Sequence, residues 1–173
     1  GPLLGSGTTP SRPCGGGARG APGRQMKARN LASPREVVRD DAPAVEAAAV
    51  LSRHDVRAIL VVDGSGAFVG VLSDSELLRA LLPPFLGESR TLARVLEESA
   101  SDVFHRRVER LTVRDLMPDE RDAPPIVSGD DTLVEVADTM VRSRASLVGV
   151  LDDGRLIGGI SIDDLISHLL KSR

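Results

Sequence analysis

A serine and an aspartate three residues apart, Ser161 and Asp164, follow an apolar stretch that ends in small residues. The segment 155–166 reads RLIGGISIDDLI, and apolar residues then recur at helical spacing. This pattern predicts a strand, a capping box and a helix. The first N–H groups of such a helix lack partners within it and favour an anion. Helix capping alone also explains both residues, because an acid in the first turn stabilises the helix dipole.

The same arrangement occurs in the first half of the chain, within a longer internal repeat. Residues 38–63 align with 127–152, and after the loss of one residue in a turn, 68–78 align with 156–166. Each copy predicts a short extended segment, a helix, two strands joined by a hairpin, and a final helix. The segments 26–31 and 111–117, which precede the two copies, also resemble each other. A unit of about 55 residues is marginal alone, so the two copies should pack together.

The repeat resembles the CBS domain, named after cystathionine β-synthase, present as a tandem pair. The resemblance rests on VRDLM at 113–117, VVDG at 61–64, and a glycine–aliphatic–Ser-x-x-acid segment at both 70–76 and 158–164. It implies an α/β (α+β) fold in which two β-α-β-β-α repeats form a pseudo-twofold disc with two clefts between them. Such modules usually pair into homodimers and bind adenosine nucleotides (AMP, ADP or ATP) as regulatory sensors.

Four segments are expected along the chain: a tail over 1–25, a first repeat over 26–82, a helical linker over 83–111 and a second repeat over 112–173. The tail is rich in Gly and Pro and lacks acids, which predicts disorder or a cloning remnant. The linker predicts an amphipathic helix, or two, over 91–111. Its basic residues, 105–107 and Arg110, are interpreted as a solvated face paired with Glu97, Glu98 and Glu109. The alternative is a contact with phosphates or a partner.

Nucleotide binding needs a carboxylate for the ribose hydroxyls, donors for phosphate and an apolar slot for adenine. In the second repeat we expect Asp164 to supply the carboxylate, Ser161 and the helix start to receive phosphate, and Ile160 to form an apolar wall. The resemblance implies that the opposite wall comes from Glu36, Val37, Val56, Arg57 and Ala58. The Arg57 guanidinium suits phosphate because it binds oxygens in bidentate fashion.

The first repeat departs from this pattern, because Ser73 is followed by Glu76 where an aspartate would bind ribose. The extra methylene shifts the carboxylate by about 1.5 Å. The implied site consists of Leu72, Ser73, Glu76, Pro125, Ile126, Ala145 and Ser146. It has no cation at the Ser146 position, so we expect it to be weak or empty.

Composition argues against several other functions. The 173 residues carry a net charge of −3, with no Trp or Tyr and three Phe, which is a poor basis for nucleic-acid binding. No apolar run reaches the ~20 residues of a membrane span. The single cysteine, Cys14, and three dispersed histidines form no metal or triad pattern, and no phosphate-binding glycine loop is present. We therefore expect a cytoplasmic, non-enzymatic module without cofactor or metal, whose output requires an unknown protein target in trans.

Two other functions stay open. One is a structural dimerisation module with empty clefts. The other is a nucleic-acid-linked regulator that uses Arg106, Arg107 and the N-terminal arm, although the net charge opposes it.

Overall fold

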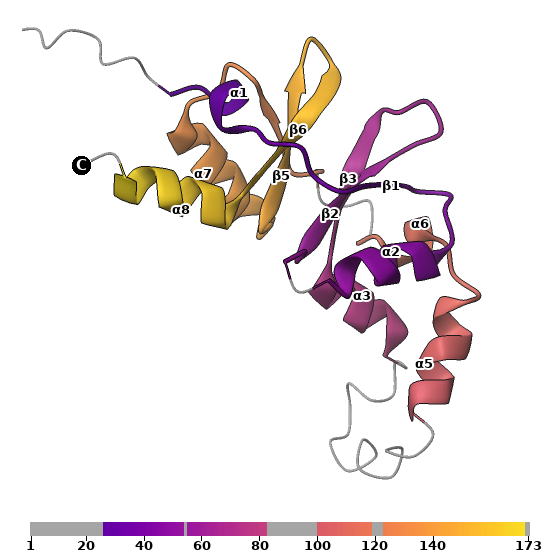
Figure 1. Cartoon of the computed structure of the whole chain (residues 1–173). Coiled ribbons are helices and arrows are strands. Elements are labelled where there is room, and N and C mark those ends of the chain that lie inside the picture. Colours follow the sequence, from indigo (N-terminus) through magenta and orange to yellow (C-terminus); the bar gives the residue numbers. More distant parts are fainter. Residues whose placement is uncertain (1–25, 54, 83–99, 119–122, 172–173) are drawn as a thin grey trace, which may run out of the picture.

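The computed structural model describes residues 26–53, 55–82, 100–118 and 123–171. Two groups of helices flank two sheets that lie side by side (Figure 1). The elements in chain order are α1 (Ala28–Leu31), β1 (Val37–Arg39), α2 (Ala44–Leu51), β2 (Ala58–Val62), β3 (Phe68–Ser73), α3 (Asp74–Leu81), α5 (Ala100–Val108), α6 (Val113–Leu116), β4 (Ile126–Ser128), α7 (Leu133–Ser143), β5 (Leu147–Asp152), β6 (Arg155–Ser161) and α8 (Ile162–Lys171).

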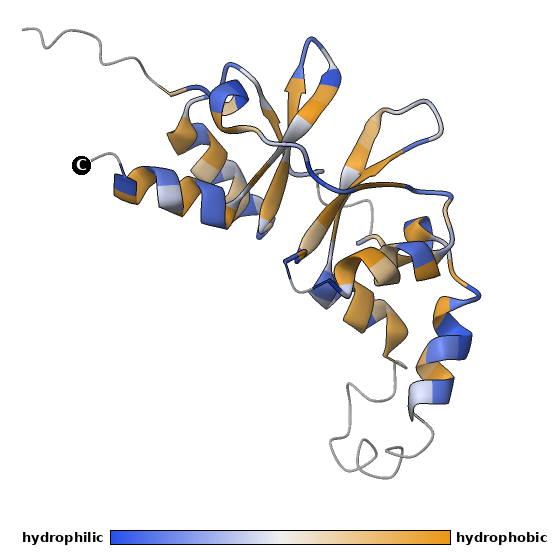
Figure 2. Ribbon diagram, viewed as in Figure 1, coloured by the Kyte–Doolittle hydropathy of each residue, from blue (hydrophilic) through white to orange (hydrophobic). Residues whose placement is uncertain are grey.

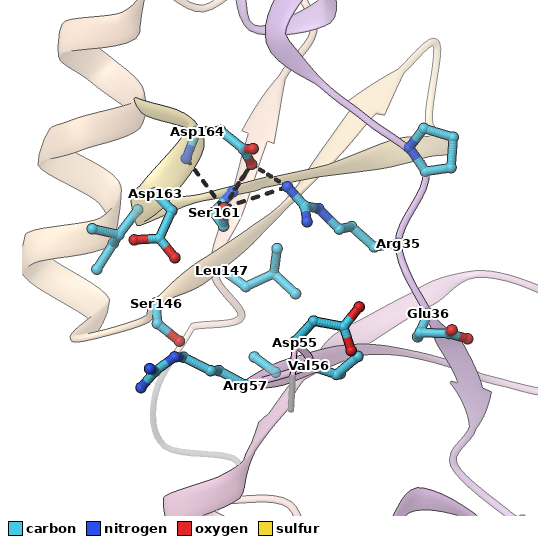
Figure 3. A pocket seen from close by; sticks show the side chains of 13 residues that line it. Arg35, Glu36, Asp55, Val56, Arg57, Ser146, Leu147, Ser161, Asp163 and Asp164 are labelled. Carbon is cyan, nitrogen blue, oxygen red and sulfur yellow. Dashed lines mark hydrogen bonds and ion pairs between the residues drawn. The ribbon is translucent and has the colours of Figure 1, made fainter. Parts of the chain in front are cut away.

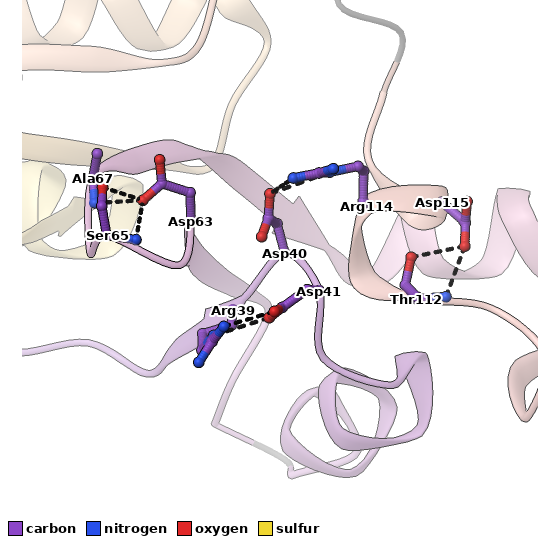
Figure 4. A network of polar contacts seen from close by, with 9 residues as sticks. All are labelled: Arg39, Asp40, Asp41, Asp63, Ser65, Ala67, Thr112, Arg114 and Asp115. Atoms are coloured by element: carbon purple, nitrogen blue, oxygen red, sulfur yellow. Dashed lines mark hydrogen bonds and ion pairs between the residues drawn. The ribbon is translucent and has the colours of Figure 1, made fainter.

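Each repeat contributes one three-stranded sheet, β1-β2-β3 or β4-β5-β6. In both sheets the first strand pairs parallel to the second, and the second pairs antiparallel to the third. The predicted β-α-β-β-α order is confirmed in both copies. The hairpin between β2 and β3 is closed by the Asp63 carboxylate, which accepts the Ser65 and Ala67 N–H groups at 2.8 and 3.0 Å (Figure 4). Gly66 occupies the positive φ of 85° that this turn requires.

The two repeats share an apolar interface between their sheets. Leu60 and Val71 of the first repeat pack with Leu147 of the second, and all three are buried. A Cβ at Gly149 of β5 would lie 2.8 Å from the Phe68 ring of β3, so only glycine allows this approach. The strands of both sheets are coloured mostly as hydrophobic, whereas hydrophilic residues are frequent on α5 (Figure 2). The expected packing of the two copies into one mixed α/β unit is confirmed.

The segments that precede the repeats are exchanged between them. Helix α1 packs on the second repeat, where Ala28 is fully buried and donates its N–H to Asp131 O at 2.8 Å. Helix α6 packs on the first repeat, where Val113 is fully buried and donates its N–H to Ala42 O at 2.9 Å. The predicted boundaries at 26–82 and 112–173 follow chain order and stay a prediction. The packing shows that each core includes the entry helix of the other repeat.

An ion pair fastens α6 to the first repeat. Asp40 follows β1 and is only 3% exposed. Its carboxylate pairs with the Arg114 guanidinium, and Arg114 Nε donates to Asp40 Oδ2 at 3.2 Å (Figure 4). Arg114 also donates its backbone N–H to Asp40 O at 2.8 Å. This pair joins residues far apart in the sequence, because α6 has crossed to the other repeat.

Within the predicted linker helix, the described part is α5, whose apolar face packs on the first core through Phe104 and Val108. Arg107 Nε donates to Ala80 O at 2.9 Å and Arg106 Nε to Asp102 O at 3.2 Å. His105 Nε2 lies 3.3 Å from Glu109 Oε1, whereas Glu97 and Glu98 lie outside the described residues, as do 1–25 and 83–99. None of the helices that the structure describes is long and apolar enough to cross a membrane.

Candidate ligand site between the repeats

A cleft of about 880 Å³ opens between the two repeats (Figure 3). One wall is the start of α8 with the beginning of β5, and the other is the segment before β2. The arm that precedes β1 closes one side. The lining residues are Pro34, Arg35, Glu36, Asp55, Val56, Arg57, Ala58, Ser146, Leu147, Ser161, Ile162, Asp163 and Asp164.

The wall at α8 is built on the capping hydrogen bonds predicted from the sequence. Asp164 Oδ2 accepts from the Ser161 backbone N–H at 2.8 Å and from the Ser161 hydroxyl at 2.7 Å. In return, the Asp164 N–H donates to Ser161 Oγ at 3.3 Å. These reciprocal contacts hold both side chains at the N-terminus of α8.

Arg35 also reaches Asp164, and its part in the site was missed by sequence reasoning. Its guanidinium pairs with Asp164 Oδ2 and lies 3.4 Å from Ser161 Oγ (Figure 3). Among the described residues, Arg35 Nε is a buried donor without a hydrogen-bond acceptor. A cation directly before a predicted strand was the available signal, but no spacing linked Arg35 to Asp164 across more than 120 positions.

The arm that carries Arg35 is held against β6 by the backbone. The Ser33 N–H donates to Gly159 O at 3.1 Å, and the Gly159 N–H donates to Ser33 O at 3.0 Å. Gly158 has a φ of 152°, and a Cβ there would lie 2.6 Å from Ser33 O. The arm can therefore lie this close only because position 158 has no side chain.

Asp164 is held in its ionised form. Partial burial raises its pKa, but the Ser161 hydroxyl and backbone N–H and the charge of Arg35 outweigh that effect, so the pKa lies below its ordinary value. The cleft thus presents a carboxylate acceptor at neutral pH.

The first repeat supplies the opposite wall through Val56, Arg57 and Ala58, as expected. Glu36 lies on this side and pairs with Arg53 at 2.6 Å, which holds its carboxylate near the rim. Arg57 extends along the floor of the cleft, and its backbone carbonyl accepts from the Asp74 N–H at 3.0 Å (Figure 3). The acids Asp55 and Asp163 also line the cleft, so its charge is mixed.

Two residues expected in this site do not line the cleft. Ile160 is fully buried in the second core, because successive side chains of a strand face opposite ways and its neighbour Ser161 faces the cleft. Val37 is 47% exposed and lies just beyond Glu36, outside the lining. Pro34, Asp55, Leu147, Ile162 and Asp163 line it without having been assigned to it.

Apart from Ser146, the residues expected in the weaker site do not line this cleft. Ser73 and Glu76 form a capping box at the start of α3, while Leu72 is buried in the first core. Ile126 is exposed on β4, and Ala145 donates its N–H to Met140 O at the end of α7.

Ser146 lines the cleft that contains Asp164. The reason is strand pairing: Leu147 is opposite Ser161, and Ser146 O accepts the Ile162 N–H at 3.0 Å. Ser146 was expected at the weaker site, and the structure places it in the lining of this cleft. Binding at that site stays a prediction.

Metal ligands are not grouped in the described parts of the chain, where no cluster of three or more His, Cys, Asp or Glu could hold an ion. Ser161, Asp164 and two arginines instead form a polar site suited to hydroxyl groups and anions.

The family model for the CBS domain matches this chain twice, over residues 28–83 and 113–171. The chain belongs to the CBS domain family. A CBS domain-containing protein of Dictyostelium discoideum is 27% identical over 122 residues, which cover 70% of this chain and 74% of that protein. The match to the family confirms the resemblance seen in the repeats.

Solved structures of CBS proteins have the same fold. One from Kribbella flavida, of unknown function, is 34% identical with a TM-score of 0.72, covering 84% of this chain and 99% of that one. CBSX2, a CBS-pair protein of Arabidopsis thaliana, has been solved in complex with AMP. That complex is 22% identical with a TM-score of 0.59, covering 84% of this chain and 96% of that one.

Proposed function

We propose that this tandem CBS protein is a non-enzymatic regulatory module that binds an adenosine nucleotide in the cleft between its repeats. The observation that carries the proposal is that one cleft is lined by an ionised Asp164 at the N-terminus of α8 and, from the other repeat, by Arg57. The AMP complex of CBSX2 supports the same ligand class.

Each part of a nucleotide has a matching group in this cleft. The ribose hydroxyls donate to the Asp164 carboxylate. Phosphate accepts from the Arg57 guanidinium and is stabilised by the positive end of the α8 dipole. Adenine packs on the apolar surface of Val56 and Ile162, which face the cleft from opposite repeats.

Regulation follows from the two-sided cleft. A ligand that touches both repeats favours the arrangement in which the walls are closest and thereby shifts the population of conformers. A separate target protein would respond to that shift. We extend the proposal to a homodimer, because α7 and α8 expose apolar side chains that a second copy would cover: Val134, Val141, Ile166, Leu169 and Leu170.

Isothermal titration calorimetry with AMP, ADP and ATP tests the proposal. Asp164→Ala should weaken binding at least tenfold, about 1.4 kcal/mol, because the ribose loses its acceptor. The matched control is Asp138→Ala, an exposed acid on α7 that pairs with Arg142 away from the cleft. Absence of binding up to millimolar nucleotide, or equal affinity of the Asp164 variant, would contradict the proposal.

A second candidate is a dimerisation module whose clefts hold no ligand. The observation that favours it is that Arg35 and Ser161 already satisfy Asp164 Oδ2. It predicts a dimer in sedimentation experiments and no change in melting temperature with any nucleotide.

A further inference from the structure

Arg35 occupies one of the two carboxylate oxygens that a ribose could use. Asp164 Oδ2 receives the Ser161 N–H, the Ser161 hydroxyl and the Arg35 guanidinium. A carboxylate oxygen has two lone pairs, so Oδ2 has no room for a further donor and only Oδ1 is left for a ligand. A ribose whose two hydroxyls each bind one oxygen of this carboxylate therefore requires a donor to leave Oδ2.

Of the three donors, Arg35 is the one that can leave. The Ser161 contacts belong to the capping box that begins α8, whereas Arg35 comes from a separate arm of the chain. The Arg35 and Asp164 side chains are 29% and 30% exposed, so water partly screens the pair and limits its strength.

The position of Arg35 has an unfavourable component. Its Nε is buried and has no acceptor among the described residues, which costs part of the free energy gained from the ion pair. The Arg35 guanidinium is therefore a weakly held partner of Asp164 that a ligand can displace.

We propose that Arg35 is an internal competitor for the ribose-binding carboxylate, so that a ribose contact to both oxygens of Asp164 requires the Arg35–Asp164 pair to open. This inference rests on the proposed function, because it assumes that Asp164 binds the ribose. It makes Arg35 a determinant of affinity that acts through Asp164, and it makes the apparent affinity depend on how often the pair is open.

The test uses adenosine, which has the ribose hydroxyls but no phosphate, so loss of a positive charge does not itself weaken binding. Arg35→Met keeps an unbranched apolar stem and removes the donor. By calorimetry, Arg35→Met should bind adenosine three- to tenfold more tightly than the wild type. With 2′,3′-dideoxyadenosine, which lacks both hydroxyls, the gain should vanish.

Arg53→Met is the matched control, because Arg53 also pairs with a cleft-lining acid, Glu36, at 2.6 Å. It should leave adenosine affinity unchanged. Equal or weaker adenosine binding by Arg35→Met, or an equal gain with the dideoxy compound, would overturn the inference.

The wild-type protein offers a second measurement that needs no variant. Salt screens the partly exposed pair, so affinity for neutral adenosine should rise between low and high ionic strength. A constant or falling affinity would overturn the inference. Asp164-dependent AMP binding would preserve the proposed function even then, whereas absence of binding by every adenosine compound would overturn both.

Discussion

The junctions β6–α8 and β3–α3 are the same element built twice, yet only the first contributes its serine and acid to the described cleft. In the first, Asp164 Oδ2 accepts from Ser161 N and Oγ at 2.8 and 2.7 Å. In the second, Glu76 Oε2 accepts from Ser73 N and Oγ at 2.7 and 2.9 Å. Capping geometry is thus nearly identical, and it does not by itself mark a binding site.

The two junctions differ in the residues of the chain segment that precedes the first strand of each sheet. Leu60 N–H donates to Glu36 O at 3.0 Å and Gly149 N–H to Pro125 O at 2.9 Å, so Glu36 corresponds to Pro125 and Arg35 to Pro124. Proline brings no charge to the equivalent place. A remote segment, rather than the capping box, therefore gives the β6–α8 junction its charged partner Arg35.

The largest expected effect is on the glycine that admits the arm. At Gly158, alanine would place a Cβ 2.6 Å from the Ser33 backbone carbonyl and would strain a φ of 152°. Gly158→Ala should therefore lower the free energy of unfolding by about 3 kcal/mol in urea denaturation.

The matched variant is Gly70→Ala on β3. A Cβ at Gly70 meets the Met117 Cε, the end of a flexible side chain that can move. The loss there should be about 1 kcal/mol. Equal losses at both positions would mean that the close approach of the arm does not depend on glycine.

The next largest loss of stability is expected at an ion pair of the exchanged entry helices. Arg114→Met leaves the buried Asp40 carboxylate without its guanidinium partner and should cost about 2 kcal/mol of unfolding free energy. Arg29→Met removes exposed pairs with Asp130 and Asp152 from the other entry segment and should cost less than about 1 kcal/mol. Chemical denaturation of both variants checks this order, and its reversal would refute the distinction between the two ion pairs.

The smallest effect concerns pH. Because the pKa of Asp164 is lower in the folded state than its ordinary value of 3.8, the carboxylate stabilises the fold above that value. This contribution is lost as the pH falls through the lowered pKa. Asp164→Asn should therefore cost about 1 kcal/mol at neutral pH and flatten the decrease in stability below about pH 4.

Thermal melts across the acid range measure this effect, with Glu76→Gln as the amide control in the other capping box. That control should keep the acid dependence contributed by Asp164. An Asp164→Asn profile that runs parallel to the wild type would contradict the prediction.

Local signals in the sequence determined the elements of this protein. Periodicity, β-branched runs, the Asp63 turn and the two Ser-x-x-acid caps act between near neighbours, and they predicted the strand and helix order of both repeats. Ile160 was expected to face the cleft but faces the core. An apolar strand end does not reveal which of its residues point to the core.

Only the tertiary structure decided which segments meet. The exchange of α1 and α6 and the pairing of Arg35 with Asp164 join residues from separate segments of the chain, and neither has a local pattern. They arise because two marginal repeats gain stability by burying surface against each other. The sequence alone established a capped helix at Asp164, and the packing placed a competing cation on its carboxylate.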